Sequence, residues 1–114
     1  MAPLREPPIR AVERVGDAIV VRLAGELDLY NADEVRAALA DVVVDAPRLI
    51  VLDLTDVEFV DSTALGVLIE ARSKLGRNGI VLAGPQLETR RALQVSGLDR
   101  HLPVYDGVDD ALAG

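Results

Sequence analysis

The sequence predicts a single α/β domain built on a mixed β-sheet. Two runs of strand length, Arg48–Leu54 and Gly79–Ala83, are almost continuously apolar, as expected for strands that are covered on both faces. Strand and helix patterns follow one another in the order ββαβαβαβα, which is typical of an α/β fold. The chain has 114 residues, 50% of them hydrophobic, which is enough for one domain with a core and too short for two.

A hairpin and a helix are predicted before the first buried strand. Val12–Val15 and Ala18–Ala24 are short β-rich runs separated by a Gly-Asp turn signal. Asn31 then precedes a helical pattern, and Glu34 three residues later completes what resembles a capping box with Asn in place of Ser or Thr. Pro47 is expected to end this helix.

The second half of the chain alternates helices and strands. A second helix is expected from about Ser62 to Leu75, closed by Gly76. The later elements are the strand Gly79–Ala83, a helix at Gln86–Ser96, a weak strand near Leu102–Tyr105 and a short helix near Val108–Ala113. Gly97 with an apolar residue behind it is the pattern of a Schellman motif, which predicts a helix end at that glycine.

Composition excludes several classes of partner. Nineteen acidic and twelve basic side chains give a net charge of −7, which phosphate backbones and anionic lipids repel, so neither nucleic acid nor a membrane is expected as a partner. Aromatic residues make up 3%, too few for a base-stacking platform. Without cysteine or a segment able to span a bilayer, we expect a soluble cytoplasmic domain at residues 11–114 after a flexible, proline-rich arm at residues 1–10.

No enzyme template fits the sequence. The one histidine, His101, stands beside a strand, where a packed or surface role is commoner than catalysis. Ser62 is not flanked by the glycines of a nucleophile elbow, and there is no glycine-rich phosphate loop. Carboxylates are scattered without metal-ligand spacing. The sequence therefore predicts no catalytic activity, no cofactor and no metal site.

The segment Asp61-Ser62-Thr63 interrupts two apolar runs and allows two interpretations. A helix cap is the simpler one, because Asp or Ser before an apolar periodic segment satisfies free N–H groups. The helical wheel also places Ser62, Gly66, Ile69 and Ser73 on one stripe. A core stripe is predicted for Ala64, Leu65, Leu68, Ala71 and Leu75. The first stripe could serve a docking partner, although Gly66 could equally indicate tight packing.

A phosphate on Ser62 would be compatible with the fold. Such a group carries about −1.5 to −2 charges and would face the free N–H groups and positive dipole end of the helix. These favourable terms, each about 0.3–1 kcal/mol, can offset repulsion from Asp61. A partner covering the same position would still meet the new charge, and about 1.4 kcal/mol is a tenfold loss of affinity.

Three motifs resemble a known family when taken in order. They are Gly25-Glu26-Leu27-Asp28 after a strand, the block from Phe59 to Leu68, and Val95-Ser96-Gly97-Leu98. Together they resemble the STAS domain of bacterial anti-sigma-factor antagonists, over about Val12 to Ala113. The resemblance implies a single STAS-like domain, a mixed β-sheet with helices packed mainly on one face.

The resemblance also implies a phosphorylation switch that regulates transcription. Unphosphorylated antagonist binds an anti-sigma factor that is itself a serine kinase, which frees the sigma factor. Phosphorylated antagonist dissociates from the anti-sigma factor, and a PP2C-type phosphatase then removes the phosphate. Carried over, Ser62 is the phosphoacceptor and Asp28 helps present it. The other implied partner-binding residues are Asp61 and Thr63 at the helix entrance and Gly66 and Ile69 on the docking face.

Alternatives remain open on the sequence alone. Ala64 stands where many family members have glycine, which narrows the room for a partner's backbone. The same fold could serve as a scaffold subunit of a stress-sensing complex or as an accessory to a membrane lipid or anion transporter. A small nucleotide-binding enzyme is the least favoured alternative. Asp53 and Asp56 are interpreted as turn residues, and the Arg90-Arg91 pair as part of a solvated face.

Overall fold

The computed structural model describes residues 6–75 and 79–114. Its strands are β1 (Ile9–Val15), β2 (Ala18–Leu27), β3 (Leu49–Val60), β4 (Ile80–Ala83) and β5 (Val104–Tyr105). Its helices are α1 (Ala32–Val44), α2 (Ser62–Leu75), α3 (Leu87–Ser96), the 3₁₀ turn η1 (Leu98–Arg100) and α4 (Val108–Ala113). The predicted order is confirmed. β1 begins at Ile9 instead of Val12, while Gly76 and the start of the predicted arm lie outside the described residues.

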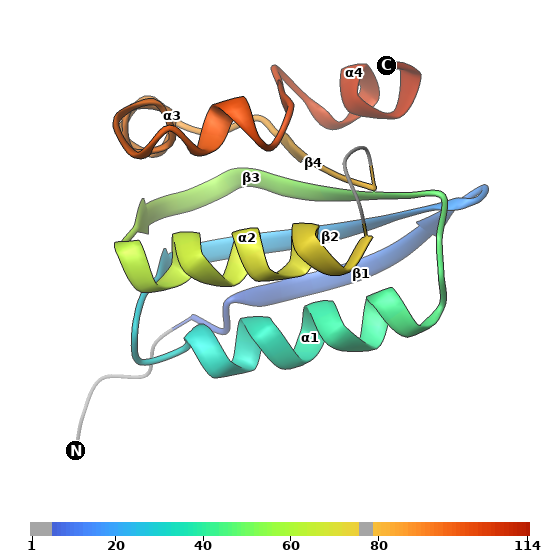
Figure 1. Ribbon diagram of the computed structural model, residues 1–114, viewed down its shortest axis with the longest axis horizontal. Helices are drawn as coiled ribbons and strands as arrows, with labels where there is room; N and C mark the ends of the chain where they lie inside the picture. Colours follow the sequence, from blue (N-terminus) through green and yellow to red (C-terminus); the bar gives the residue numbers. More distant parts are fainter. Residues whose placement is uncertain (1–5, 76–78) are drawn as a thin grey trace.

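The five strands form one mixed sheet in the order β1-β2-β3-β4-β5 (Figure 1). β1 and β2 are an antiparallel hairpin, and every later neighbour is parallel. β3 lies at the centre, and both faces of its first part, the apolar run Leu49–Leu54, are covered. The strand continues to Val60, beyond the predicted end at Leu54. The other apolar run, β4, pairs with β3 through Ile50 to Asp53, so the last part of β3 runs on beyond its neighbour.

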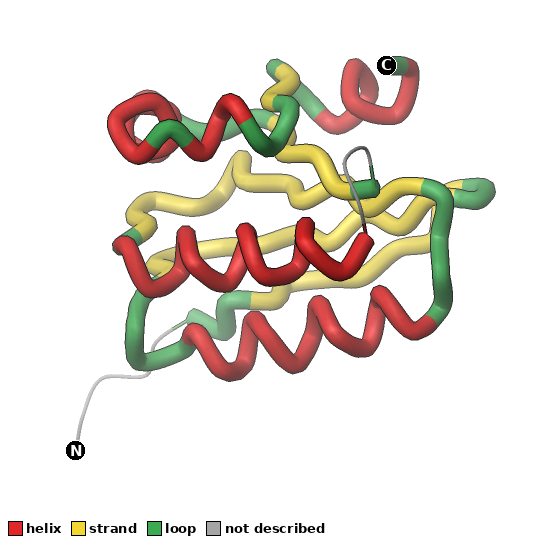
Figure 2. The backbone as a smooth tube through the Cα atoms, viewed as in Figure 1, coloured by secondary structure: helices red, strands yellow, loops and turns green. Residues whose placement is uncertain are grey.

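Helices cover the two faces of the sheet unequally, as Figure 2 shows for α1 and α2 in front of the strands. The larger core combines alternate residues of β2 and β3 with apolar side chains of α1, α2 and α3. The smaller core lies on the opposite face, where Ala111 of α4 packs against Val20 and Val51. The predicted arrangement, with helices mainly on one face, is confirmed. None of the described helices is long and apolar enough to cross a membrane.

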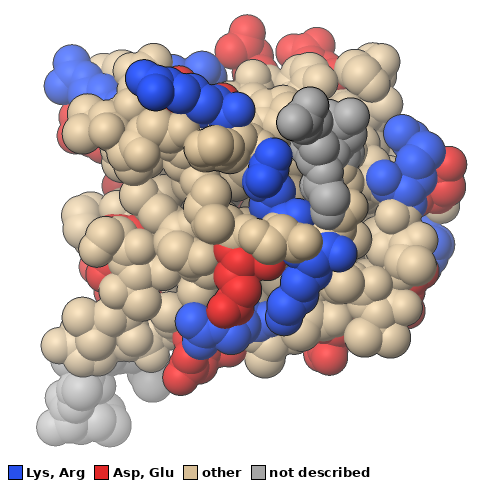
Figure 3. Space-filling model, in the orientation of Figure 1, with Lys and Arg blue, Asp and Glu red and all other residues tan. Residues whose placement is uncertain are grey.

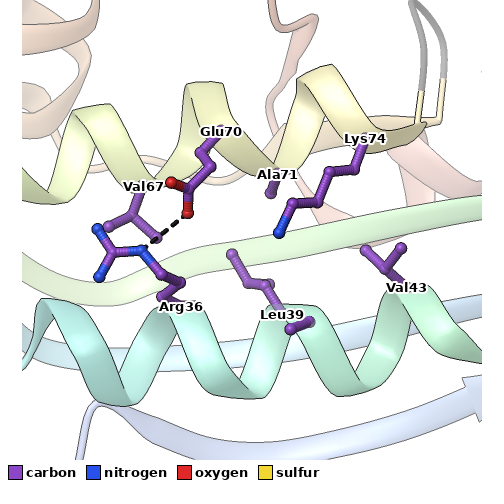
Figure 4. A pocket seen from close by; sticks show the side chains of 8 residues that line it. Arg36, Leu39, Val43, Val67, Glu70, Ala71 and Lys74 are labelled. Atoms are coloured by element: carbon purple, nitrogen blue, oxygen red, sulfur yellow. Dashed lines mark hydrogen bonds and ion pairs between the residues drawn. The ribbon is translucent and has the colours of Figure 1, made fainter.

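The seam between α1 and α2 closes that face (Figure 4). Leu39 and Val67 pack at its floor, and Arg36 on α1 donates a 2.8 Å hydrogen bond from Nε to Glu70 on α2. The hollow left between the helices holds about 10 Å³, little more than one water molecule. The seam is therefore a packing feature of the domain and offers no room for a ligand.

The far face of the sheet carries ion pairs where α4 does not cover it. Arg22 donates to Asp53 at 2.6 Å and to Glu13 at 2.9 Å. The hydrogen bond from Arg22 is the main reason that the pKa of Glu13 is lowered. A carboxyl group whose pKa is lowered on folding stabilises the folded state at pH values above its unfolded-state pKa. This contribution is lost as the pH falls through the folded-state pKa. Because Glu13 and Arg22 are both solvent-exposed, their ion pair contributes little to stability and acts chiefly to keep this surface polar.

The end of α1 contains a strained residue that provides a stability test. The helix ends at Val44, ahead of Pro47 as predicted, and Ala46 has a φ of 49°. This left-handed conformation costs little for glycine but is unfavourable for alanine. We expect Ala46→Gly to raise the free energy of unfolding by about 0.5–1 kcal/mol, measured by urea denaturation.

Ala37, exposed within α1, supplies the matched control. Ala37→Gly should lower the free energy of unfolding by about 0.5–1 kcal/mol, because glycine is unfavourable inside a helix. The two alanine-to-glycine changes should therefore have opposite signs. A loss of stability in both variants would contradict the strain at Ala46.

Candidate functional site

The candidate site lies at the carboxyl end of the parallel strands, where β3 leads into α2. Leu27, the last residue of β2, is in register with Val60, the last residue of β3. The loops that follow therefore leave the sheet side by side. The register shifts at Gly25, whose φ of 73° is one that glycine adopts freely, and this bulge redirects the Glu26–Asp28 segment.

Asp61 connects the two loops through both oxygens of its carboxylate. Oδ1 accepts a 3.0 Å hydrogen bond from the backbone N–H of Ala64, which makes Asp61 the cap of α2. Oδ2 accepts a 3.1 Å hydrogen bond from the backbone N–H of Leu29 in the β2–α1 loop. The backbone N–H of Asp61 also donates to the carbonyl of Leu27 at 3.0 Å. The start of α2 and the loop after β2 are thus held as one unit.

Asn31 stabilises the β2–α1 loop from its other end. The predicted capping box is wrong, because the Asn31 side chain makes no hydrogen bond to the first turn of α1. Its Oδ1 instead accepts from the N–H of Asp28 at 3.0 Å, and its Nδ2 donates to the carbonyl of Glu26 at 2.7 Å. The Asp28 carboxylate then accepts from the N–H of Tyr30 at 3.0 Å. The hydrogen bonds from Asn31 to the loop therefore replace the bond that a cap would make to α1.

Ser62 opens α2 with an exposed side chain. Within residues 6–75 and 79–114, its hydroxyl has no hydrogen-bond partner, and Thr63 beside it is also exposed. Asp61 takes the capping role, so Ser62 is free of it. The register and the Asp61–Leu29 bond place the Asp28 turn next to Asp61, in the neighbourhood of Ser62 that the sequence predicted.

The outer stripe of α2 is open to solvent along its length. Gly66 and Ile69 are both exposed, as the docking interpretation of this stripe requires. A Cβ placed on Gly66 would meet no heavy atom within 4 Å among the described residues, so tight packing within the chain does not explain this glycine. The buried face consists of Ala64, Val67, Leu68 and Ala71, with Leu65 and Leu75 partly buried against the core. The wheel missed only Val67.

Two exposed apolar residues next to this stripe were not identified from the sequence. Leu29 and Tyr30 project from the β2–α1 loop, with Tyr30 82% exposed. The end of the molecule where α2 begins carries few charged atoms on the face drawn in Figure 3. The signal was present in the sequence, because two apolar residues directly follow the Gly25–Asp28 motif in a polar loop.

The remaining candidates lie elsewhere or are satisfied. Asp53 is buried on the far face, where Arg22 and both the N–H and hydroxyl of Thr55 donate to it. Asp56 pairs with Arg10. Their interpretation as turn residues is wrong, because both lie within β3, which continues to Val60. No group of three or more metal-ligating side chains occurs in the part of the chain that the structure describes.

The chain belongs to the STAS domain family. The family model matches residues 9–111, nearly all of the sequence. A curated relative, the anti-sigma-F factor antagonist RsfB of Mycobacterium tuberculosis, is 36% identical over 98 residues, which cover 83% of this chain and 79% of the relative. The resemblance inferred from three short motifs is thereby confirmed.

Solved structures agree with this assignment. An anti-sigma factor antagonist from Mycobacterium paratuberculosis is 36% identical with a TM-score of 0.85, covering 90% of this chain and 89% of that one. The antagonist SpoIIAA in its unphosphorylated form is 26% identical with a TM-score of 0.71, covering 82% and 85%. A sulfate transporter family protein from Wolinella succinogenes is 25% identical with a TM-score of 0.74, covering 87% and 84%. The fold is thus shared by regulators and by transporter-family proteins.

The double role of Asp61 can be tested by stability measurements. Asp61→Ala removes the cap of α2 and the bond to Leu29 together. We expect a loss of about 2 kcal/mol in the free energy of unfolding, measured by urea denaturation. Ser62→Ala is the adjacent control and should change stability by less than about 0.5 kcal/mol. Equal stabilities for the two variants would show that Asp61 does not hold the site together.

Proposed function

We propose that this protein is an anti-sigma-factor antagonist that is switched by phosphorylation of Ser62. Unmodified, it binds an anti-sigma factor and thereby releases a sigma factor in the cytoplasm. The observation that carries the proposal is the exposed hydroxyl of Ser62, which has no partner among the described residues and opens a helix whose cap is supplied by another residue. The names of RsfB and SpoIIAA as antagonists support the assignment.

We further propose that the anti-sigma factor is a serine kinase and that a PP2C-type phosphatase reverses its action. In the forward step the Ser62 oxygen bonds to the terminal phosphorus of a nucleoside triphosphate, the bond to the diphosphate breaks, and the hydroxyl proton passes to a base of the kinase. The antagonist contributes only the acceptor, so it needs no catalytic group of its own. That SpoIIAA has a defined unphosphorylated form supports this regulation.

The docking face follows from what surrounds Ser62. Gly66 and Ile69 continue its stripe along α2, and the absence of a side chain at Gly66 lets a partner's backbone come close. Thr63 and Asp61 shape the helix entrance, and Asp28 stands in the adjoining turn. Ala64 is buried, so its methyl group packs inward and leaves the docking face unobstructed.

The scaffold or transporter-accessory alternative has one observation in its favour, the likeness to a transporter-family protein. It differs from the antagonist in its assembly. An antagonist should elute at low mass alone and shift only with the anti-sigma factor. Isolation of the native protein in a very large complex or with a permease would favour the alternative.

Ser62 variants test the switch directly. Each anti-sigma factor kinase encoded in the same genome should be purified and titrated against the wild-type chain. Ser62→Asp should weaken binding of the cognate kinase by about tenfold or more, because a charge is placed at the interface, and Ser62→Ala should bind like wild type. Calorimetry measures both affinities.

Mass spectrometry after incubation with the kinase and ATP should map one phosphate to Ser62. Thr63→Ala is the matched control and should still be labelled, whereas Ser62→Ala should not. Labelling at Thr63, or wild-type affinity of Ser62→Asp, would contradict the assignment of Ser62.

Substitution of Gly66 distinguishes an effect on partner binding from an effect on folding. Gly66→Ala adds a methyl group that meets nothing within the described chain, so the fold should gain up to about 1 kcal/mol from the better helix former. Affinity for the cognate kinase should fall by about tenfold if the partner's backbone covers this position. Unchanged affinity together with raised stability would place Gly66 outside the interface.

A further inference from the structure

A second feature of the same end of the molecule is a groove between β3 and α3. β3 continues past the Asp53 position at which its pairing with β4 ends, and α3 lies alongside this extension (Figure 1). Phe59 and Val60 of β3 form one wall, and Ala92 and Val95 of α3 form the other. The groove holds about 330 Å³ and is open to solvent.

The groove is lined mainly by apolar side chains. Phe59 is 51% exposed and Val95 is 89% exposed, and because both line the groove they form one contiguous apolar surface. Thr89, which also lines the groove, is only 1% exposed, and its hydroxyl has no hydrogen-bond partner in the described chain. Because this hydroxyl is closed off from solvent, a partner in the groove does not reach it, and its missing hydrogen bond is a cost to the fold itself.

The position of the groove identifies its occupant. Val60 lines the groove and is followed directly by Asp61 and Ser62. A protein that covers Ser62 can therefore contact the groove as part of the same interface. The rim carries one charge of each sign, Glu88 and Arg91, 3.9 Å apart, which gives no preference for a polyanion. An apolar, protein-sized partner fits this combination better than a nucleic acid or a membrane.

We propose that the groove receives an apolar side chain of the same anti-sigma factor that contacts Ser62, packed between Phe59 of β3 and Val95 of α3. The groove is a second anchor, separate from the phosphorylated hydroxyl. This inference rests on the proposed function. It adds Phe59, Ala92 and Val95 to the partner surface and makes α3 part of partner selection.

Val95→Asp tests the apolar anchor. Because Val95 is exposed, its replacement should leave the fold intact, while a charge in the groove should weaken binding of the purified cognate kinase by about tenfold. The matched control is Val44→Asp, an exposed valine at the end of α1 (81% exposed), which should bind within about twofold of wild type. In phosphorylation assays Val95→Asp should raise KM with kcat unchanged, since the groove does not contact the acceptor hydroxyl.

Thr89→Val is a control beneath the groove surface. Removing an unpaired buried hydroxyl should leave the melting temperature unchanged or raised, and affinity should stay within about twofold of wild type because the partner does not reach this group. Wild-type affinity of Val95→Asp, with the wild-type chain binding the kinase, would overturn the groove alone. Failure of the wild-type chain to bind any anti-sigma factor would overturn the proposed function and this occupant together. Concentration-dependent dimerisation abolished by Val95→Asp would instead assign the groove to a second copy.

Discussion

The carboxylate of Asp61 is the interaction on which the candidate site depends. One oxygen caps α2 through Ala64, and the other holds the N–H of Leu29. A neutral cap such as serine could satisfy the helix, but its single oxygen could not serve both loops as a bidentate acceptor does. Since a charged acceptor also strengthens each bond, the positions of Ser62 and of the apolar loop residues are fixed relative to each other.

The pairing of strands in the sheet makes the double hydrogen bonding of Asp61 possible. Parallel pairing of β2 with β3 brings the ends of the two strands to the same edge, with Leu27 opposite Val60. The bulge at Gly25 then turns the exit of β2 so that the following loop lies against the start of α2. The register is fixed by the buried faces, because a shift of one residue would move the apolar side chains of β2 and β3 out of both cores. Function is carried by loops, but their placement is a property of the core.

Long-range periodic features were predictable from the sequence, and local side-chain competition was not. Continuous apolar runs gave β3 and β4, and the wheel separated the buried and exposed sides of α2. Asn31 was misassigned because a side chain before a helix can bond forward to the helix or backward to a loop. The choice depends on where the Glu26 carbonyl lies, which only the bulge at Gly25 determines.

The groove beside α3 could not be predicted from the sequence for a related reason. Phe59 lies beyond Leu54, where the apolar run was expected to end, so the extension of β3 to Val60 was not predicted, and Val95 lies in a helical pattern. Their exposure follows from the lengths of two neighbouring strands, since β4 is too short to cover the end of β3. Strand length at this edge depends on where the next turn forms, a tertiary property that no single segment encodes.

Capping by Asp61 and switching at Ser62 are compatible because the first acts on the free energy of folding and the second on the free energy of partner binding. A domain of this size is stable by about 5–15 kcal/mol, so a repulsion of about 1 kcal/mol between a phosphate and Asp61 leaves it folded. The positive end of α2 reduces even that cost. At an interface the same 1 kcal/mol changes affinity by about fivefold, and full desolvation of the phosphate by a partner costs considerably more. Placing the acceptor one residue after the cap therefore makes the complex far more sensitive to modification than the fold.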